Sequence, residues 1–265
     1  MGICTDKSTT YLRRLGYNVV RHPREGVRPL DLIGRQRDSV TYLGSIDKLI
    51  TTPPGPLPEI KTDNAAAGIS GQSSSKLALA VGLNVLGAVL SAFGAGVGAT
   101  AKYKNAKTIQ FIFGDVLTDY AVPLDIGNFL KNGEVDGENP ILNQYVMGNG
   151  RLYVLTRTIK TNKFTVKAEG SGGAEVALDV PAIKEMLGGR VQVSAESDSA
   201  GTVTYEGEKY LTFGFECFEV GVAEGTLTMM SATAGSVALS NEPGATTPRA
   251  DPILLDPVGL LDLDG

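Results

Sequence analysis

Residues 77–101 read LALAVGLNVLGAVLSAFGAGVGATA and form the longest uncharged stretch of the chain, between Lys76 and Lys102. About 20 apolar residues are enough to cross a bilayer as a helix. Glycines and Asn84 interrupt this run, however, and no second apolar run or secretory signal accompanies it. We therefore expect an element that is not permanently inserted in a membrane.

The same run fits a helix and a strand, which is unusual for an ordinary core element. At helical spacing it carries one apolar stripe: Leu79, Leu83, Leu86, Leu90, Phe93 and Val97. At a spacing of two it carries one apolar strand face: Leu77, Leu79, Val81, Leu83, Val85, Val89, Phe93 and Val97. We expect a helix packed against a sheet at rest, and an extended hairpin with the strand predicted at 107–113 in a second state.

A second amphipathic hairpin is predicted at 159–168 and 174–180, around a turn at 170–173. Apolar and charged residues alternate in both arms. Each arm has about the ten residues that a tilted membrane strand needs, although an edge hairpin over a core would look the same. Further strands are expected at 151–158, 190–195, 202–205 and 210–218, and short helices at 125–130 and 181–187. Residues 220–230 fit a strand or a closing helix.

Composition limits the function. The formal net charge of -5 argues against a nucleic-acid partner. Two cysteines, Cys4 and Cys217, give no disulfide framework and suit a reducing compartment, so we expect a cytoplasmic resting state. The single histidine, His22, provides no histidine-based zinc site, and no catalytic or phosphate-binding motif is present. We expect neither an enzyme nor a bound metal or cofactor.

The C-terminal end differs in kind from the rest. Residues 240–250 have the composition of a protease-accessible linker. From residue 241 onward there are five acids and one base, a net charge of -4 (1 - 5). This acidity would complement a basic surface. Burial of the large apolar residues favours docking of the tail on the body: Ile253, Leu254, Leu255, Val258, Leu260, Leu261 and Leu263.

The N-terminal sequence LGYNVVRHPREGVRPLDLIGRQ (15–36), preceded by Cys4, resembles the opening of the bacterial gasdermins. Those proteins are cytoplasmic pore formers of antiphage defence. The resemblance implies an α+β fold with a twisted central antiparallel sheet, peripheral helices and a short C-terminal autoinhibitory tail. It also implies that Cys4 is acylated, with a palmitoyl group as the expected lipid.

The resemblance divides the chain into a pore-forming body (1–240) and a removable segment (241–265). A caspase-like or trypsin-like protease would cut the linker, and Arg249 suits a trypsin-like one. The freed body would oligomerise in the bacterial inner membrane as a β-barrel pore and kill the cell. The expected cleavage region comprises Val237, Ala238, Leu239, Ser240, Asn241, Glu242, Pro243, Gly244, Ala245, Thr246, Thr247, Pro248, Arg249 and Ala250.

In this interpretation the lipid-facing residues of the two hairpins are Leu77, Leu79, Val81, Leu83, Val85, Val89, Phe93, Ile109, Phe111, Phe113, Phe164, Val166, Val176 and Leu178. The alternative is a soluble α+β binding module in which the apolar run is a buried core helix. That alternative gives no role to an acylated Cys4 or to a removable tail.

Overall fold

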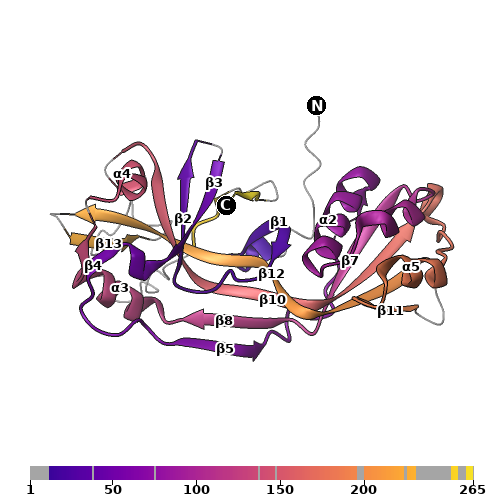
Figure 1. Ribbon diagram of the computed structural model, residues 1–265, viewed down its shortest axis with the longest axis horizontal. Helices are drawn as coiled ribbons and strands as arrows, with labels where there is room; N and C mark the ends of the chain where they lie inside the picture. Colours follow the sequence, from indigo (N-terminus) through magenta and orange to yellow (C-terminus); the bar gives the residue numbers. More distant parts are fainter. Residues whose placement is uncertain are drawn as a thin grey trace, which may run out of the picture.

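The computed structural model describes residues 12–37, 39–74, 76–136, 138–146, 148–195, 200–223, 226–230, 252–255 and 261–264. Two long antiparallel strands, β10 (Arg151–Glu169) and β12 (Thr202–Ala223), run through the whole molecule (Figure 1). At about 3.3 Å per residue, the 19 residues of β10 extend over roughly 60 Å. The other strands and the helices are arranged along this pair, and the fold is the predicted α+β type.

At one end the pair is the centre of a sheet with the order β1-β12-β10-β2-β3-β14. Its neighbouring strands pair antiparallel, except that the C-terminal β14 pairs parallel with β3. The outer strands are β1 (Asn18–Arg24), β2 (Asp31–Gln36), β3 (Ser39–Ser45) and β14 (Leu263–Asp264). Strand β13 (Thr226–Met230) continues this end on β12, and β4 (Ile50–Thr52) pairs with β9 (Glu134–Val135).

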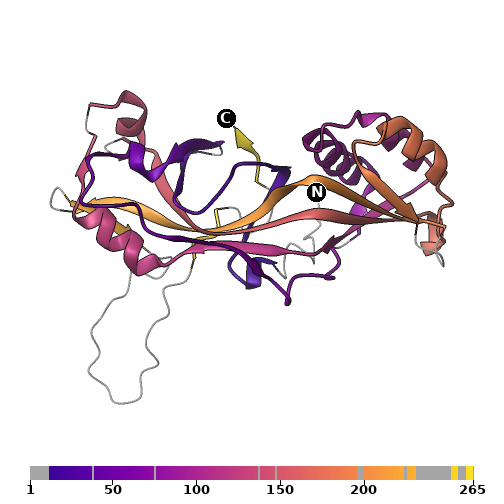
Figure 2. The same cartoon turned by 60° about the horizontal axis from the view of Figure 1, so that its bottom comes forward.

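Toward the other end, β10 pairs first with β8 (Leu117–Ala121) and then with β7 (Thr108–Gly114). Strand β5 (Ile60–Ala65) lies on β8, β6 (Leu77–Ala78) on β7, and β11 (Gln192–Ala195) on β12. Three register shifts interrupt the β10–β12 ladder between Leu155 and Lys163. Such bulges bend a strand and increase its twist, and they lie between the two lobes visible in Figure 2.

The helices lie at the two ends of the sheet. In the lobe of β7 and β11, α2 (Leu79–Ala92), η2 (Val97–Tyr103) and α5 (Val180–Leu187) cover one face (Figure 1). Helices α3 (Pro123–Lys131) and α4 (Pro140–Val146) belong to the opposite lobe, and the short turns η1 (Ile46–Lys48) and η3 (Ser171–Gly173) complete the elements. Each lobe has its own apolar core.

The expected helix in the apolar run is present as α2, and the strand expected at 107–113 is β7. Residues 220–223 continue the sheet as the end of β12 and residues 226–230 as β13, and neither stretch is helical. Within the described residues, no helix is long and apolar enough to span a membrane. The tandem strands predicted at 151–158 and 159–168 are one strand, β10, and those at 202–205 and 210–218 are both parts of β12.

The main difference between the sequence-based prediction and the resting structure concerns the second hairpin. Residues 159–168 pair with β12 on one side and with β8 and β7 on the other, so β10 has no free edge there for 174–180. The backbone of residues 174–180 pairs with the end of β10 only through a bridge between Glu169 and Glu175, and the chain then enters α5. The alternation of apolar and charged residues correctly predicted a half-buried strand at 159–168, but it did not identify the strands that pair with it.

Candidate functional site: the docked tail and the covered apolar segments

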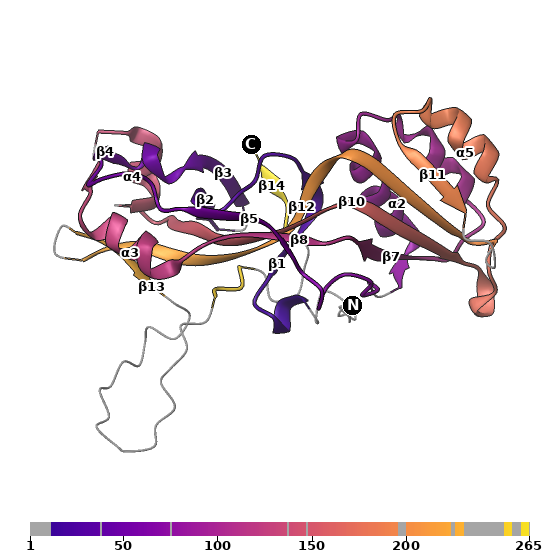
Figure 3. The same ribbon diagram turned by 90° about the horizontal axis from the view of Figure 1, so that it is seen from below.

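The C-terminal tail lies along the body as an extra strand (Figure 3). The Leu261 amide donates to the Val19 carbonyl, and the Leu261 carbonyl accepts from the Arg21 amide, both at 2.8 Å. Two residues later, Leu263 pairs parallel with Val40 of β3. The tail therefore joins β1 to β3, and since these are the two ends of the order β1-β12-β10-β2-β3, it closes a ring of strands.

The interior of this ring is an apolar cluster that includes the tail. Leu255 and Leu261 are 2% and 7% exposed, and Ile253 and Leu263 pack against the same cluster while half-buried. The body contributes these buried residues: Val20, Val27, Ile33, Val40, Tyr153, Leu155, Phe215 and Cys217. Apolar burial is the main favourable contribution to tail docking.

Asn18 fixes the first part of the tail from a buried position on β1. Its amide Nδ2 donates to the Ile253 carbonyl at 2.8 Å, and its Oδ1 accepts from the Leu255 amide at 2.7 Å. The Ile253 amide donates to the Cys217 carbonyl at 2.9 Å. Burial raises the pKa of the fully buried Cys217 thiol, which stays protonated. Removal of the Asn18 amide would leave the Ile253 carbonyl and the Leu255 amide without these hydrogen bonds. Asn18 is therefore a specific anchor for the tail.

Basic side chains of the N-terminal strands hold the outside of the tail. Arg21 pairs with Asp262 at 2.6 Å, although both side chains are more than two-fifths exposed. Arg35 Nη1 donates to the Leu255 carbonyl at 2.6 Å. Exposed ion pairs contribute little to stability, so the Arg21–Asp262 pair adds orientation to a tail bound mainly by burial and backbone pairing.

Of the remaining tail residues, Leu254 is half-buried and lines a separate cavity of about 760 Å³ together with Pro252 and Arg157. Val258 and Leu260 lie outside the described residues, as do Cys4 and the whole predicted cleavage region, 237–250. The structure thus gives contacts for five of the seven tail residues, and their inhibitory role stays a prediction.

The residues predicted to face lipid are gathered in the core of the α2 lobe. Val81 is the exception, at 43% exposure. The buried ones are Val89, Phe93, Ile109, Phe111, Phe164 and Val166. The half-buried ones packed against them are Leu77, Leu79, Leu83, Val85, Phe113, Val176 and Leu178. The two apolar faces that would meet lipid therefore cover each other at rest.

Close packing and one polar contact hold the helical cover on the sheet. The hydroxyls of Tyr103 in η2 and Tyr205 in β12 lie 2.6 Å apart, and both side chains are completely buried. Gly82 permits α2 to approach β7, because a Cβ there would lie 2.7 Å from Cβ of Ile109. Nothing in the sequence marks Tyr103 and Tyr205 as partners, since 102 residues separate them.

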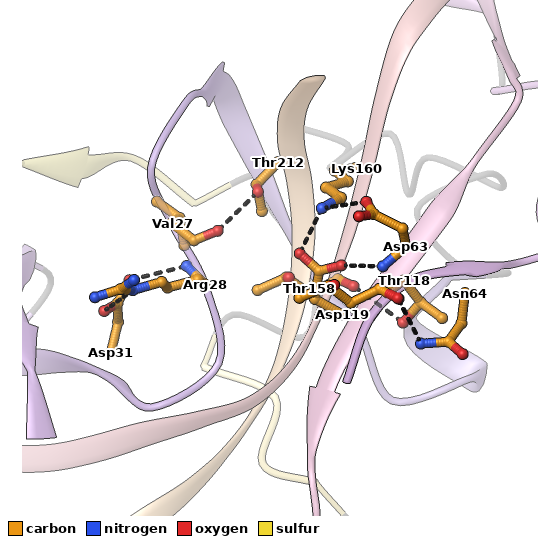
Figure 4. Close-up of polar contacts among 11 residues, drawn as sticks. Val27, Arg28, Asp31, Asp63, Asn64, Thr118, Asp119, Thr158, Lys160 and Thr212 are labelled. Atoms are coloured by element: carbon orange, nitrogen blue, oxygen red, sulfur yellow. Dashed lines mark hydrogen bonds and ion pairs between the residues drawn. The ribbon is translucent and has the colours of Figure 1, made fainter. Parts of the chain in front are cut away.

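A polar cluster joins β5, β8 and β10 beside the register shifts of β10 (Figure 4). Lys160 Nζ pairs with Asp119 at 2.6 Å and with Asp63 at 2.9 Å, and the Asp63 amide donates to Asp119 at 2.8 Å. Burial alone would lower the pKa of Lys160, but the two carboxylates outweigh it and raise that pKa. The cluster ties β5 and β8 to β10. Sequence analysis missed it because each member occupies an ordinary polar position on its own strand.

Comparisons with known proteins give the family and the fold. Residues 20–226 match the model of the Bacterial Gasdermin Family. Gasdermin bGSDM of Vitiosangium sp. (strain GDMCC 1.1324) is 52% identical over 265 residues, covering 100% of both chains. Gasdermin bGSDM of a Desulfuromonadales bacterium is 35% identical over 246 residues, covering 91% of this chain and 92% of the relative. The structure of a bacterial gasdermin from Bradyrhizobium tropiciagri has the same fold, with a TM-score of 0.60 and 21% identity, over 84% of this chain and 90% of that one.

Proposed function

The chain belongs to the bacterial gasdermin family, and from this premise we propose that it is a pore-forming protein held inactive by its own C-terminal tail. The observation that carries the proposal is the tail strand between β1 and β3, with Leu255 and Leu261 buried in the body. One cut in the linker would break the covalent connection between such a segment and the body.

The activating step is proteolysis within 237–250 by a caspase-like or trypsin-like partner. Arg249 is the expected site for a trypsin-like enzyme, because it is the single base in the tail segment from residue 241 onward. Cleavage gives a body of about residues 1–240 and a free segment that carries the acidic charge. Loss of that charge also removes repulsion from anionic lipid.

The cut body then inserts residues 77–113 and 159–180 as strands. In hydrocarbon every backbone polar group needs a partner, so strands can cross only in a closed ring. A single copy supplies too few strands, and many copies must therefore assemble into one large β-barrel. The apolar faces that pack together in the α2 lobe would turn outward to lipid, and their small or polar faces inward to the lumen.

A palmitoyl group on Cys4 would assist the transfer from the cytoplasm to the inner membrane. One acyl chain alone binds a membrane weakly and reversibly. The lipid would therefore bias the cut body toward the bilayer without anchoring the resting protein there. Pores in the inner membrane would kill the cell, which is the expected antiphage outcome.

The test compares the intact chain with a chain ending at Ser240, on liposomes loaded with dye and on expression in cells. The shortened chain is expected to release dye and to be toxic, and the intact chain to do neither. Mass spectrometry of protein from cells should find an acyl adduct on Cys4, and Cys4→Ala should weaken killing. If neither form releases dye, the binding-module alternative replaces the pore.

A further inference from the structure

The tail occupies a strand-shaped slot rather than an open surface. On one side β1 presents the Val19 carbonyl and the Arg21 amide, both bonded to Leu261. On the other side β3 pairs with Leu263 through Val40. Between the two strand edges lies the apolar interior of the ring, which receives Leu255 and Leu261. Backbone pairing on both sides with pockets for alternate side chains is how proteins recognise extended peptides.

Within the described residues, two short segments on the C-terminal side of the linker hold the tail. Residues 252–255 bond to Asn18, Cys217 and Arg35, and residues 261–264 bond to β1 and β3. A cut within 237–250 lies outside both segments and breaks none of these contacts. Cleavage therefore changes the covalent connection without removing the strand from its slot.

We propose that the slot between β1 and β3 is a reversible peptide-binding site whose ligand is the C-terminal tail, held through residues 252–255 and 261–264, in cis before cleavage and in trans after it. Dissociation of the peptide, and not the cut, is then the committing step. The inference rests on the proposed role of the tail as inhibitor. It adds that a cut chain stays closed while its peptide remains bound and closes again when peptide is supplied.

The physical effect of the cut is a loss of effective concentration. A short flexible linker keeps a tethered ligand at an effective concentration of about 1 mM. After cleavage the peptide concentration falls to that of the protein itself, so occupancy of the slot becomes dependent on dilution. The same contacts can thus hold the tail firmly in the uncut chain and release the peptide after one peptide bond of the linker is cut.

The experiment uses the full chain, with Cys4→Ser and an engineered protease site inside 241–248, and no membrane. Cys217 is the reporter, because it is fully buried and its carbonyl contacts Ile253 of the tail. After complete cleavage at 10 µM, the excised peptide is expected to co-elute with the body in gel filtration. Thiol labelling of Cys217 should stay near that of the uncut chain, and should rise at least tenfold when the peptide is diluted away.

Rebinding is measured with a fluorescent synthetic peptide of residues 251–264. Methylation of the Leu261 amide removes the donor to Val19, and should weaken binding at least tenfold. The matched control carries the methyl on Leu254, whose amide makes no hydrogen bond within the described chain, and should bind nearly as well as the unmodified peptide.

The inference is overturned if the peptide separates from the body immediately after cleavage and the synthetic peptide does not protect Cys217 at 100 µM. Equal binding of the two methylated peptides would also overturn it. Since no membrane is present, these results leave the pore proposal intact. Conversely, retained and exchangeable peptide supports the slot even if the peptide-free body never releases dye, which would count against the pore alone.

Discussion

Asn18 shows how much of the tail's attachment depends on one side chain. It is 2% exposed and bonds to backbone groups of Ile253 and Leu255, 235 and 237 residues away. A polar residue between Tyr17 and Val19 gives no sequence signal for such a role. The leucines of the tail predicted docking from their hydrophobicity, but hydrogen-bond partners so distant in sequence can be found only in the folded chain.

Asn18→Ala should loosen the tail without altering the α2 lobe. The Leu255 amide would lose its acceptor in a buried place, at a cost of about 1–3 kcal/mol. We expect a lower free energy of unfolding and roughly tenfold or faster thiol labelling of Cys217 in the uncut chain. Asn132→Ala is the control, because this exposed amide bonds only within the α3 region and should change neither quantity.

Cys217 should make stability depend on pH above neutrality. Its thiol pKa is raised by burial and by Glu216 and Glu219, whereas the unfolded thiol ionises near pH 8.5. The unfolded state then binds fewer protons than the folded state, so stability falls as pH rises, by up to about 1.4 kcal/mol per pH unit. Urea unfolding between pH 8 and 9.5 should show this slope, and Cys217→Ala should reduce it, leaving the smaller contribution of the buried tyrosines whose pKa values are also raised. Equal slopes in the two chains would contradict the burial of this thiol.

The Tyr103–Tyr205 contact should behave as a coupled pair. Tyr205→Phe leaves a buried hydroxyl on Tyr103 without its partner, and should cost about 1–3 kcal/mol of unfolding free energy. The double Phe variant should cost clearly less than the sum of the two single variants. A double-mutant cycle by urea unfolding measures this, and strict additivity would show that the hydroxyls do not interact.

At the scale of elements, the periodicity of apolar residues predicted the helix α2 correctly but gave the wrong partner for residues 159–168. The run at 77–101 predicted a helix on a sheet, and α2 lies on β7 with Leu86, Val89 and Leu90 buried. Alternation in 159–168 identified a strand but paired it with 174–180. Buried Thr156, Thr158 and Thr161 interrupt the apolar pattern at the bulges, so the long β10 looked like two strands.

Gly82→Ala should test the close approach of α2 to β7. An added Cβ meets Ile109 at 2.7 Å, so the helix must shift, and we expect a loss of about 1–3 kcal/mol. Gly127→Ala in α3 is the matched control, since nothing lies within 4 Å of its Cβ position; there the lower entropy of the unfolded chain should add about 0.4–1 kcal/mol. Comparison of the thermal unfolding of the two variants separates the effect of packing against Ile109 from the general effect of replacing a helical glycine by alanine.

At the scale of the molecule, two apolar clusters lie toward opposite ends of β10 and β12. The strand ring contains the tail, and the α2 lobe contains the faces proposed for the membrane. The polar cluster of Lys160, Asp119 and Asp63 lies beside the register shifts of β10 (Figure 4). Because the long strands are continuous, loss of the tail strand at one end can change the twist of the sheet at the other. This provides a physical route from cleavage to opening of the α2 lobe.

Inhibition of the pore by the tail can be measured as dye release from liposomes, with the full chain before cleavage at a site engineered in 241–248 and after cleavage and removal of the peptide. We expect no release before the cut and rapid release from the peptide-free body. The same preparation with excess tail peptide should stay closed. Release by the uncut chain, or intact liposomes after complete removal of the peptide, would contradict the proposal that the tail inhibits a pore.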